Sequence, residues 1–96
     1  MLLKVHKAYR DVIALCDKEL LGKRFEEGKM QLELKDSFYS GEEIDENKAI
    51  DVLMENQEAC FNIVGKKACN AALKAGVIEK ESIKTVQSIP LALSLL

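Results

Sequence analysis

The segment Asn62-Ile63-Val64-Gly65-Lys66-Lys67 combines residue types that can hold an anion. Gly65 is expected to open a helix, whose first N–H groups have no partner inside the helix and carry its partial positive charge. Two lysines follow, so the segment predicts a site for phosphate or another anion. It is not a P-loop, because the upstream glycine and the following Ser or Thr of that motif are missing. The alternative interpretation is an ordinary helix start with solvated lysines.

A second basic turn, Gly22-Lys23-Arg24, would extend this site if the fold brings it close to Gly65. The candidate anion-binding or partner-binding residues are therefore Gly22, Lys23, Arg24, Asn62, Gly65, Lys66 and Lys67. These residues support electrostatic binding, and they contain no paired acid and base of the kind that proton-transfer catalysis uses.

Candidate nucleophiles and metal ligands are few. The cysteines Cys16, Cys60 and Cys69 form no CxxC pair and are expected to be free, buried thiols in a reducing compartment. Cys69 follows Gly65 by one helical turn, where the helix dipole would lower its thiol pKa, but its place on an apolar face favours core packing instead. His6 is the sole histidine, which excludes a His-rich metal site. We predict no catalytic residue, no cofactor and no metal site.

The composition indicates a globular chain, with 48% hydrophobic and 31% charged residues. Its net charge of −2 argues against tight, non-specific binding to nucleic acid, which depends on many Lys and Arg contacts to phosphate. Charged residues near the N-terminus do not fit a signal peptide. The longest apolar run, Ile89 to Leu96, is far shorter than a membrane span. We therefore expect a cytoplasmic protein that does not cross a membrane.

The first half of the chain predicts strands. Residues 2–8 alternate and residues 12–16 are apolar throughout, which indicates an antiparallel hairpin whose second strand is central. Asp17 is expected to cap a short helix over residues 18–21, and Phe25 to anchor the charged segment that follows. Met30, Leu32 and Leu34 alternate with polar residues and predict a strand with one buried face.

The second half predicts two helices and a strand. Asp45 is a good cap for a helix that runs to about Glu58, with an apolar stripe over Ala49, Ile50, Leu53 and Met54. The acidic cluster around this cap is interpreted as a complement to the helix dipole, not as a cation site. A second helix is expected from about Gly65 to Ala75. Residues 83–89 alternate and predict an edge strand that Pro90 ends.

These elements predict a single α+β domain over residues 1–96, with two principal helices on one face of a mostly antiparallel sheet. The C-terminal tail, residues 91–96, is unusually apolar. It is expected either to pack back on the domain or to form a homo-oligomer contact.

An ordered set of short motifs resembles one known family. The motifs are Cys16 to Lys23, Glu27-Gly28, Phe38-Tyr39-x-Gly41-Glu42, Asn62 to Gly65, Ala75 to Ile78 and Ile89-Pro90. Together they resemble an uncharacterised archaeal family known only as domain of unknown function number 424, over nearly the whole chain. The resemblance implies a small stand-alone cytoplasmic protein and carries no activity with it.

Two functional hypotheses follow. The first is a non-enzymatic binding module within a protein or RNA–protein assembly of an archaeal cytoplasm. The second is a small enzyme or ligand-binding protein that holds a phosphorylated ligand at the Asn62–Lys67 loop. Convergence of Asn62, Lys66 and either Lys23 or Arg24 on a deep pocket would favour the second hypothesis, and a flat arrangement would favour the first.

Overall fold

The computed structural model describes residues 1–93 and consists of strands, short helices and two longer helices. The strands are β1 (Leu2–His6), β2 (Val12–Cys16), β3 (Arg24–Glu27), β4 (Met30–Glu33), β5 (Glu42–Glu43), β6 (Cys60–Val64), β7 (Lys84–Val86) and β8 (Ile89–Leu93). The helices are η1 (Lys18–Leu20), α1 (Asp36–Tyr39), α2 (Glu46–Glu55), α3 (Lys66–Ala75) and η2 (Lys80–Ser82). Within these residues, no helix is long and apolar enough to cross a membrane.

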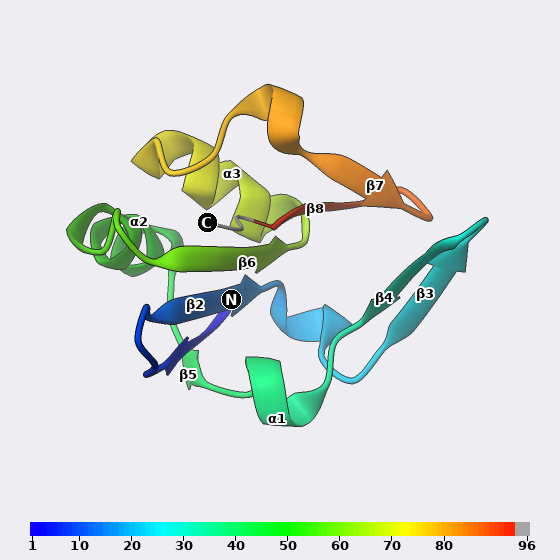
Figure 1. Ribbon diagram of the computed structural model, residues 1–96, viewed down its shortest axis with the longest axis horizontal. Coiled ribbons are helices and arrows are strands. Elements are labelled where there is room, and N and C mark those ends of the chain that lie inside the picture. Colours follow the sequence, from blue (N-terminus) through cyan, green and yellow to red (C-terminus); the bar gives the residue numbers. More distant parts are fainter. Residues whose placement is uncertain (94–96) are drawn as a thin grey trace.

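Six strands form one sheet in the order β5-β1-β2-β6-β8-β7, and β3 pairs with β4 in a separate hairpin (Figure 1). The predicted β1–β2 hairpin is confirmed, with Leu3 opposite Leu15. The pairing of β2 with β6 is parallel, and the other four pairings of the six-stranded sheet are antiparallel. The fold is therefore α+β with a mostly antiparallel sheet, as predicted.

Two hydrophobic clusters cover the two faces of this sheet. The helices α2 and α3 pack on one face, where Ile13, Leu15 and Ile63 of the sheet meet Leu53 and Ala72 of the helices. The opposite face carries a second cluster, formed with η1, α1 and the β3–β4 hairpin. Both principal helices thus lie on one face, and the central strand β2 is covered on both sides.

The strand β6 (Cys60–Val64) was not predicted, because this segment was interpreted only as the connection between two helices. It lies in the centre of the sheet, between β2 and β8. Phe61 and Ile63 alternate with the half-buried Asn62, so the strand pattern is present but short. The helix α2 accordingly ends at Glu55 instead of Glu58.

The prediction that Pro90 ends a strand over residues 83–89 is also wrong. The chain turns at Gln87 and Ser88, and Pro90 lies inside β8, opposite Thr85 of β7. The carbonyl of Pro90 accepts a hydrogen bond from the N–H of Gly65 at 2.8 Å, just beyond the end of β6. Pro90 is the second residue of β8 and lies where β6 has ended, and a missing N–H is tolerated near such a strand end.

Three further predictions, on a helix cap, on two methionines and on the apolar tail, have different outcomes. Asp45 caps α2 as predicted, with its Oδ1 accepting from the N–H of Lys48 at 2.8 Å. Met30 and Met54 were expected in the core, but they are 40% and 51% exposed. Of the apolar tail, Leu91 and Ala92 are buried in β8 and Leu93 is exposed, whereas residues 94–96 lie outside the described part of the chain.

Candidate functional site

The loop predicted to bind an anion lies where the parallel strands β2 and β6 both end. Cys16 pairs with Val64 in the sheet, so Asp17 and Gly65 follow side by side. The N–H of Asp17 donates to the carbonyl of Val64 at 3.1 Å. In many open sheets, ligands bind beyond the carboxyl ends of parallel strands. The predicted loop therefore lies at the edge of the sheet where such ligands bind.

The Asp17 carboxylate occupies the end of α3. Its Oδ1 accepts from the N–H of Ala68 at 2.8 Å and its Oδ2 from the N–H of Lys67 at 3.2 Å. Asp17 is 4% exposed. The N–H groups of Lys67 and Ala68 are therefore not free for an external anion, because a buried carboxylate of the same chain takes its place. Asp17 makes no side-chain hydrogen bond to η1, the helix that it was expected to cap.

The close approach of the Asp17 carboxylate to the start of α3 requires a glycine at residue 65. A β-carbon at this residue would lie 2.3 Å from Cγ of Asp17, and the backbone φ of +113° lies in a region that side chains rarely adopt. The glycine was correctly placed at the start of a helix, but its function is to let the Asp17 carboxylate approach the helix end.

Burial keeps the nearby thiols protonated. It raises the pKa of Cys16 from 9.0 to about 11, and the negative charge of Asp17 adds to the effect. Burial and Asp17 likewise raise the pKa of Cys69 to about 11, although a hydrogen bond with the Gly65 backbone opposes the shift. The alternative in which the helix dipole activates Cys69 is therefore wrong. Cys16, Cys60 and Cys69 are free cysteines, and Cys16 and Cys69 pack in the core as predicted, whereas Cys60 is only half-buried.

The second basic turn does not complete a pocket with this loop. The N–H of Gly22 donates to the carbonyl of Leu34 at 2.7 Å, which fixes the start of the β3–β4 hairpin. Arg24 pairs with Glu26 of the same hairpin at 2.6 Å. Lys23, Lys66 and Lys67 are exposed.

Asn62 lies on the face of the sheet opposite α3, the helix that carries Lys66 and Lys67. Its neighbours Phe61 and Ile63 belong to the cluster under α2 and α3, so the alternation of β6 turns Asn62 toward the opposite face. The surface has a larger and a smaller hollow, and none of the seven candidate residues lines either of them.

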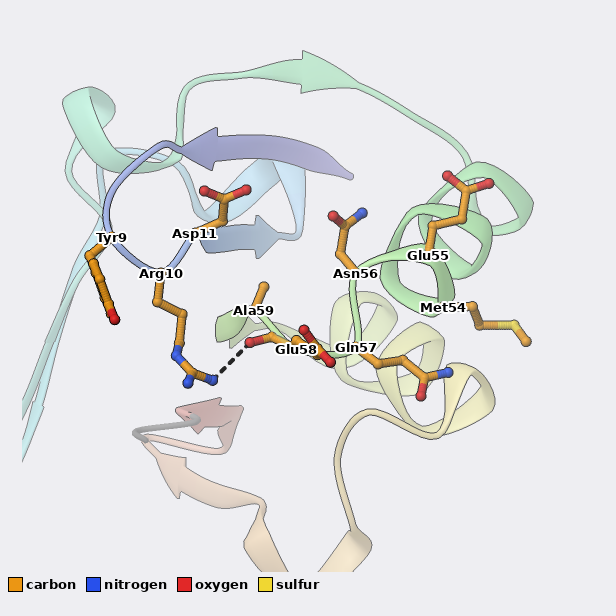
Figure 2. Close-up of a pocket in the computed structure, with 9 residues that line it drawn as sticks. All are labelled: Tyr9, Arg10, Asp11, Met54, Glu55, Asn56, Gln57, Glu58 and Ala59. Atoms are coloured by element: carbon orange, nitrogen blue, oxygen red, sulfur yellow. Dashed lines mark hydrogen bonds between the residues drawn. The ribbon is translucent and has the colours of Figure 1, made fainter.

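The larger hollow, which we call the Tyr9 hollow, lies at the opposite end of β2 and β6. Its volume is about 1050 Å³, and it is lined by Tyr9, Arg10, Asp11, Met54, Glu55, Asn56, Gln57, Glu58 and Ala59. Figure 2 shows how the turn between β1 and β2 faces the loop between α2 and β6. No sequence motif pointed to these residues. The signal that could have found them is Tyr9, an aromatic residue in a short polar turn.

Hydrogen bonds hold the two loops of the Tyr9 hollow in place. Nη1 of Arg10 donates to the carbonyl of Glu58 at 3.0 Å (Figure 2). The N–H of Cys60 donates to the carbonyl of Asp11 at 2.9 Å. The side chain of Asn56 turns back and donates from Nδ2 to the carbonyl of Val52 at 2.8 Å, which closes the end of α2. The hollow is therefore formed by fixed backbone.

A smaller hollow of about 360 Å³ lies beside the end of α3, between residues 76–82 and β8. Its lining includes Gly76, Val77 and Leu93. His6, by comparison, is committed to structure: its ring stacks on Phe38 at 4.4 Å, and its Nε2 lies 2.9 Å from the Phe38 carbonyl. Among the described residues, no group of His, Cys, Asp and Glu side chains is arranged to hold a metal ion.

Comparison with known proteins gives a fold and a family. The family described as "Protein of unknown function (DUF424)" matches residues 6–95. A crystal structure of an uncharacterized conserved protein from Methanopyrus kandleri superposes with a TM-score of 0.85 and 26% sequence identity. The match covers 96% of this chain and 87% of that chain. No protein with a curated description matches.

Proposed function

Because the chain belongs to the DUF424 family of proteins of unknown function, we propose its function from its own surface: it is a non-enzymatic binding module of an archaeal cytoplasmic assembly. The observation that carries this proposal is the contrast between the two ends of β2 and β6. At one end, Asp17 occupies the helix N-terminus. At the other end, two fixed loops present the Tyr9 hollow to solvent.

The exposed side chains around the Tyr9 hollow support binding of a macromolecule. Tyr9 is fully exposed and Met54 is 51% exposed, and the exposed Arg10 lies between the two loops. Tyr, Met and Arg are the residue types that protein interfaces favour, because each combines a large contact area with adaptable or polar contacts. Exposed side chains of these types around one hollow support a partner that covers them.

The alternative, a phosphorylated ligand at the Asn62–Lys67 loop, has less support. The ligand would compete with Asp17 for the N–H groups of Lys67 and Ala68. Lys66 and Lys67 would offer only exposed charges, whose interactions water and salt weaken.

Affinity capture tests the binding module. The tagged chain is incubated with native archaeal lysate at low and high salt, and each protein recovered is purified and mixed with the chain alone. We expect at least one partner that forms a defined complex with the purified chain. Failure to reconstitute any complex across the salt series would overturn the proposal.

A parallel amide NMR titration with phosphate and a nucleotide tests the alternative. The binding-module proposal expects the amide signals of Lys67 and Ala68 to stay unchanged, because Asp17 already occupies them. Saturable shifts of these two signals would favour the phosphorylated-ligand hypothesis.

A further inference from the structure

We propose that the Tyr9 hollow binds a basic, extended segment of a partner protein, with the Tyr9 ring as its anchor. This inference rests on the binding function proposed above and names the surface and the chemistry of the partner. It is carried by the charge of the hollow, by its size and polar groups, and by the exposure of Tyr9.

The charge of the Tyr9 hollow favours a cation. Its lining contains the carboxylates of Asp11, Glu55 and Glu58 and a single cationic side chain, Arg10. Arg10 is already engaged by the Glu58 carbonyl. Lys7 pairs with Asp11 at 3.0 Å, whereas the two other acids of the hollow, Glu55 and Glu58, have no cationic partner among the described residues.

The end of α2 adds to this negative potential. Glu55 is the last residue of α2, and the C-terminal end of a helix carries a partial negative charge. A lysine or arginine side chain in the hollow would therefore meet carboxylates and the helix end together. A nucleic-acid backbone would be repelled by the same groups, so the partner is a protein segment and not RNA.

The shape and polar groups of the hollow fit a chain segment better than a small molecule. Its volume of about 1050 Å³ is at the upper end of small-molecule pockets, which are roughly 300–1000 Å³. Figure 2 shows the hollow open between two loops, not enclosed. The side chain of Gln57 offers a donor and an acceptor to a peptide backbone that lies along the loop.

Tyr9 supplies the apolar contact. It is fully exposed at the tip of the β1–β2 turn, where the fold gives its ring no cover. An exposed aromatic ring at the rim of a hollow that carboxylates also line suits the stem of a lysine or the guanidinium plane of an arginine, through packing and the attraction of a cation to the ring face. Tyrosines that become buried when a partner binds are frequent energetic centres of interfaces.

NMR titration of the full ¹⁵N-labelled chain tests the inference. The probe is a short synthetic peptide of lysine, arginine and leucine, and its counterpart has glutamate in place of the cations. We expect saturable amide shifts at residues 9–11 and 55–59 with the basic peptide only. Shifts spread over the whole acidic surface, or equal binding of the acidic peptide or of an RNA oligonucleotide in the hollow, would overturn the proposal.

A matched pair of double variants separates specific binding from general attraction. Glu55→Lys/Glu58→Lys changes the hollow, and Glu19→Lys/Glu81→Lys makes the same change of net charge at exposed acids outside it. We expect the first variant and Tyr9→Ala each to raise the Kd at least tenfold, and the control to change it less than threefold. An equal weakening by both double variants would contradict the assignment.

The partner recovered by affinity capture distinguishes this inference from the proposed function. If the Glu55→Lys/Glu58→Lys chain holds that partner as tightly as the unmodified chain, the binding module stands and the assignment of the hollow fails. If no partner is reconstituted while the hollow binds the basic peptide specifically, the assignment stands and the proposed function fails.

Discussion

Gly65 and Asp17 lie so close together that each restricts what the other can be. A β-carbon at residue 65 would lie 2.3 Å from Cγ of Asp17, and the φ of +113° adds backbone strain. We expect Gly65→Ala to lower the free energy of unfolding by about 3 kcal/mol or more. Gly28→Ala is the matched control, because φ is +61° there and nothing lies within 4 Å of the added carbon. It should cost about 1 kcal/mol.

Urea denaturation of both variants measures the difference. A loss at Gly65 no larger than the loss at Gly28 would contradict the close contact. A further check is the double variant Asp17→Ala/Gly65→Ala, which should lose less stability than the sum of the single variants because the first change removes the group that the new carbon strikes.

The buried thiols predict a loss of stability in alkali. The pKa of Cys16 and of Cys69 is about 11 in the folded chain and 9.0 when exposed, so only the unfolded state releases these protons between pH 9 and 11. The thiols therefore contribute their full stability below pH 9, and it is lost as the pH rises toward 11. Each thiol accounts for about 2 kcal/mol of this loss.

Thermal unfolding at a series of pH values from 8 to 11 tests this prediction. The Cys16→Ala/Cys69→Ala variant is less stable at pH 8, but its melting temperature should fall less steeply with pH. Part of the fall should persist, because burial also raises the pKa of Tyr39 to about 12 from 10.0. Identical slopes for the two chains would contradict the assignment to the thiols.

Single residues could be predicted from the sequence where their partners are local. The cap of α2 by Asp45 joins residues three positions apart, and it was predicted correctly. The bonds from the N–H groups of Lys67 and Ala68 to Asp17 span 50 and 51 positions, and only the parallel pairing of β2 with β6 brings these groups together. The start of α3 was therefore predicted correctly, but the carboxylate that occupies it was missed.

At the scale of elements, the turn between β7 and β8 links two hairpins. Gln87 donates from its N–H to Glu27 and from Nε2 to the carbonyl of Glu26 at 2.6 Å, so this turn holds the tip of the β3–β4 hairpin (Figure 1). Gln87 and Ser88 both have positive φ, 50° and 66°, as in the two-residue turns that favour Asn and Gly. Two residues that are not glycine therefore adopt a backbone conformation that favours glycine.

Ser88→Gly should stabilise the protein. It relieves the positive φ without removing a described hydrogen bond, and we expect a gain of about 0.5–1 kcal/mol in urea denaturation. Gln87→Gly also relieves a positive φ but deletes the bond to the Glu26 carbonyl, so it should bring no gain. A stabilising effect of Gln87→Gly as large as that of Ser88→Gly would show that the link between the hairpins contributes nothing.

The strand β6 was missed where its partners lie far along the chain, whereas β3 was missed although its partner β4 follows it directly. The β1–β2 hairpin has close partners and a clear pattern, and it was predicted. The strand β6 has five residues with Asn62 at its middle, and its partners β2 and β8 lie far along the chain on either side. Pro90 was interpreted as a strand end because it has no N–H to donate. That absence matters only where a neighbouring strand needs the donor, which the sequence does not reveal.

At the scale of the whole molecule, β8 completes the sheet between β6 and β7. Leu91 and Ala92 are buried and pair with Val64 and Ile63 of the central strand. We expect a chain that ends at Pro90 to lose cooperative thermal unfolding, whereas a chain that ends at Leu93 should unfold cooperatively. Circular dichroism melting of both chains checks this, and a cooperative transition in the shorter chain at the temperature of the full chain would contradict it.

The order of strands in the sheet also has a consequence for the speed of folding. The central strands β2 and β6 are neighbours in space, but residues 17–59 separate them along the chain, and β6 then gains its other neighbour only from β8. Contacts between residues far apart in sequence slow folding, because a long loop must close before any of them forms. During synthesis, β1 and β2 can pair early as a hairpin, yet the centre of the sheet must wait until β6 and β8 have both been made. Until then, the face of β2 that α2 and α3 cover in the finished domain stays exposed, and exposed apolar surface of this kind favours aggregation.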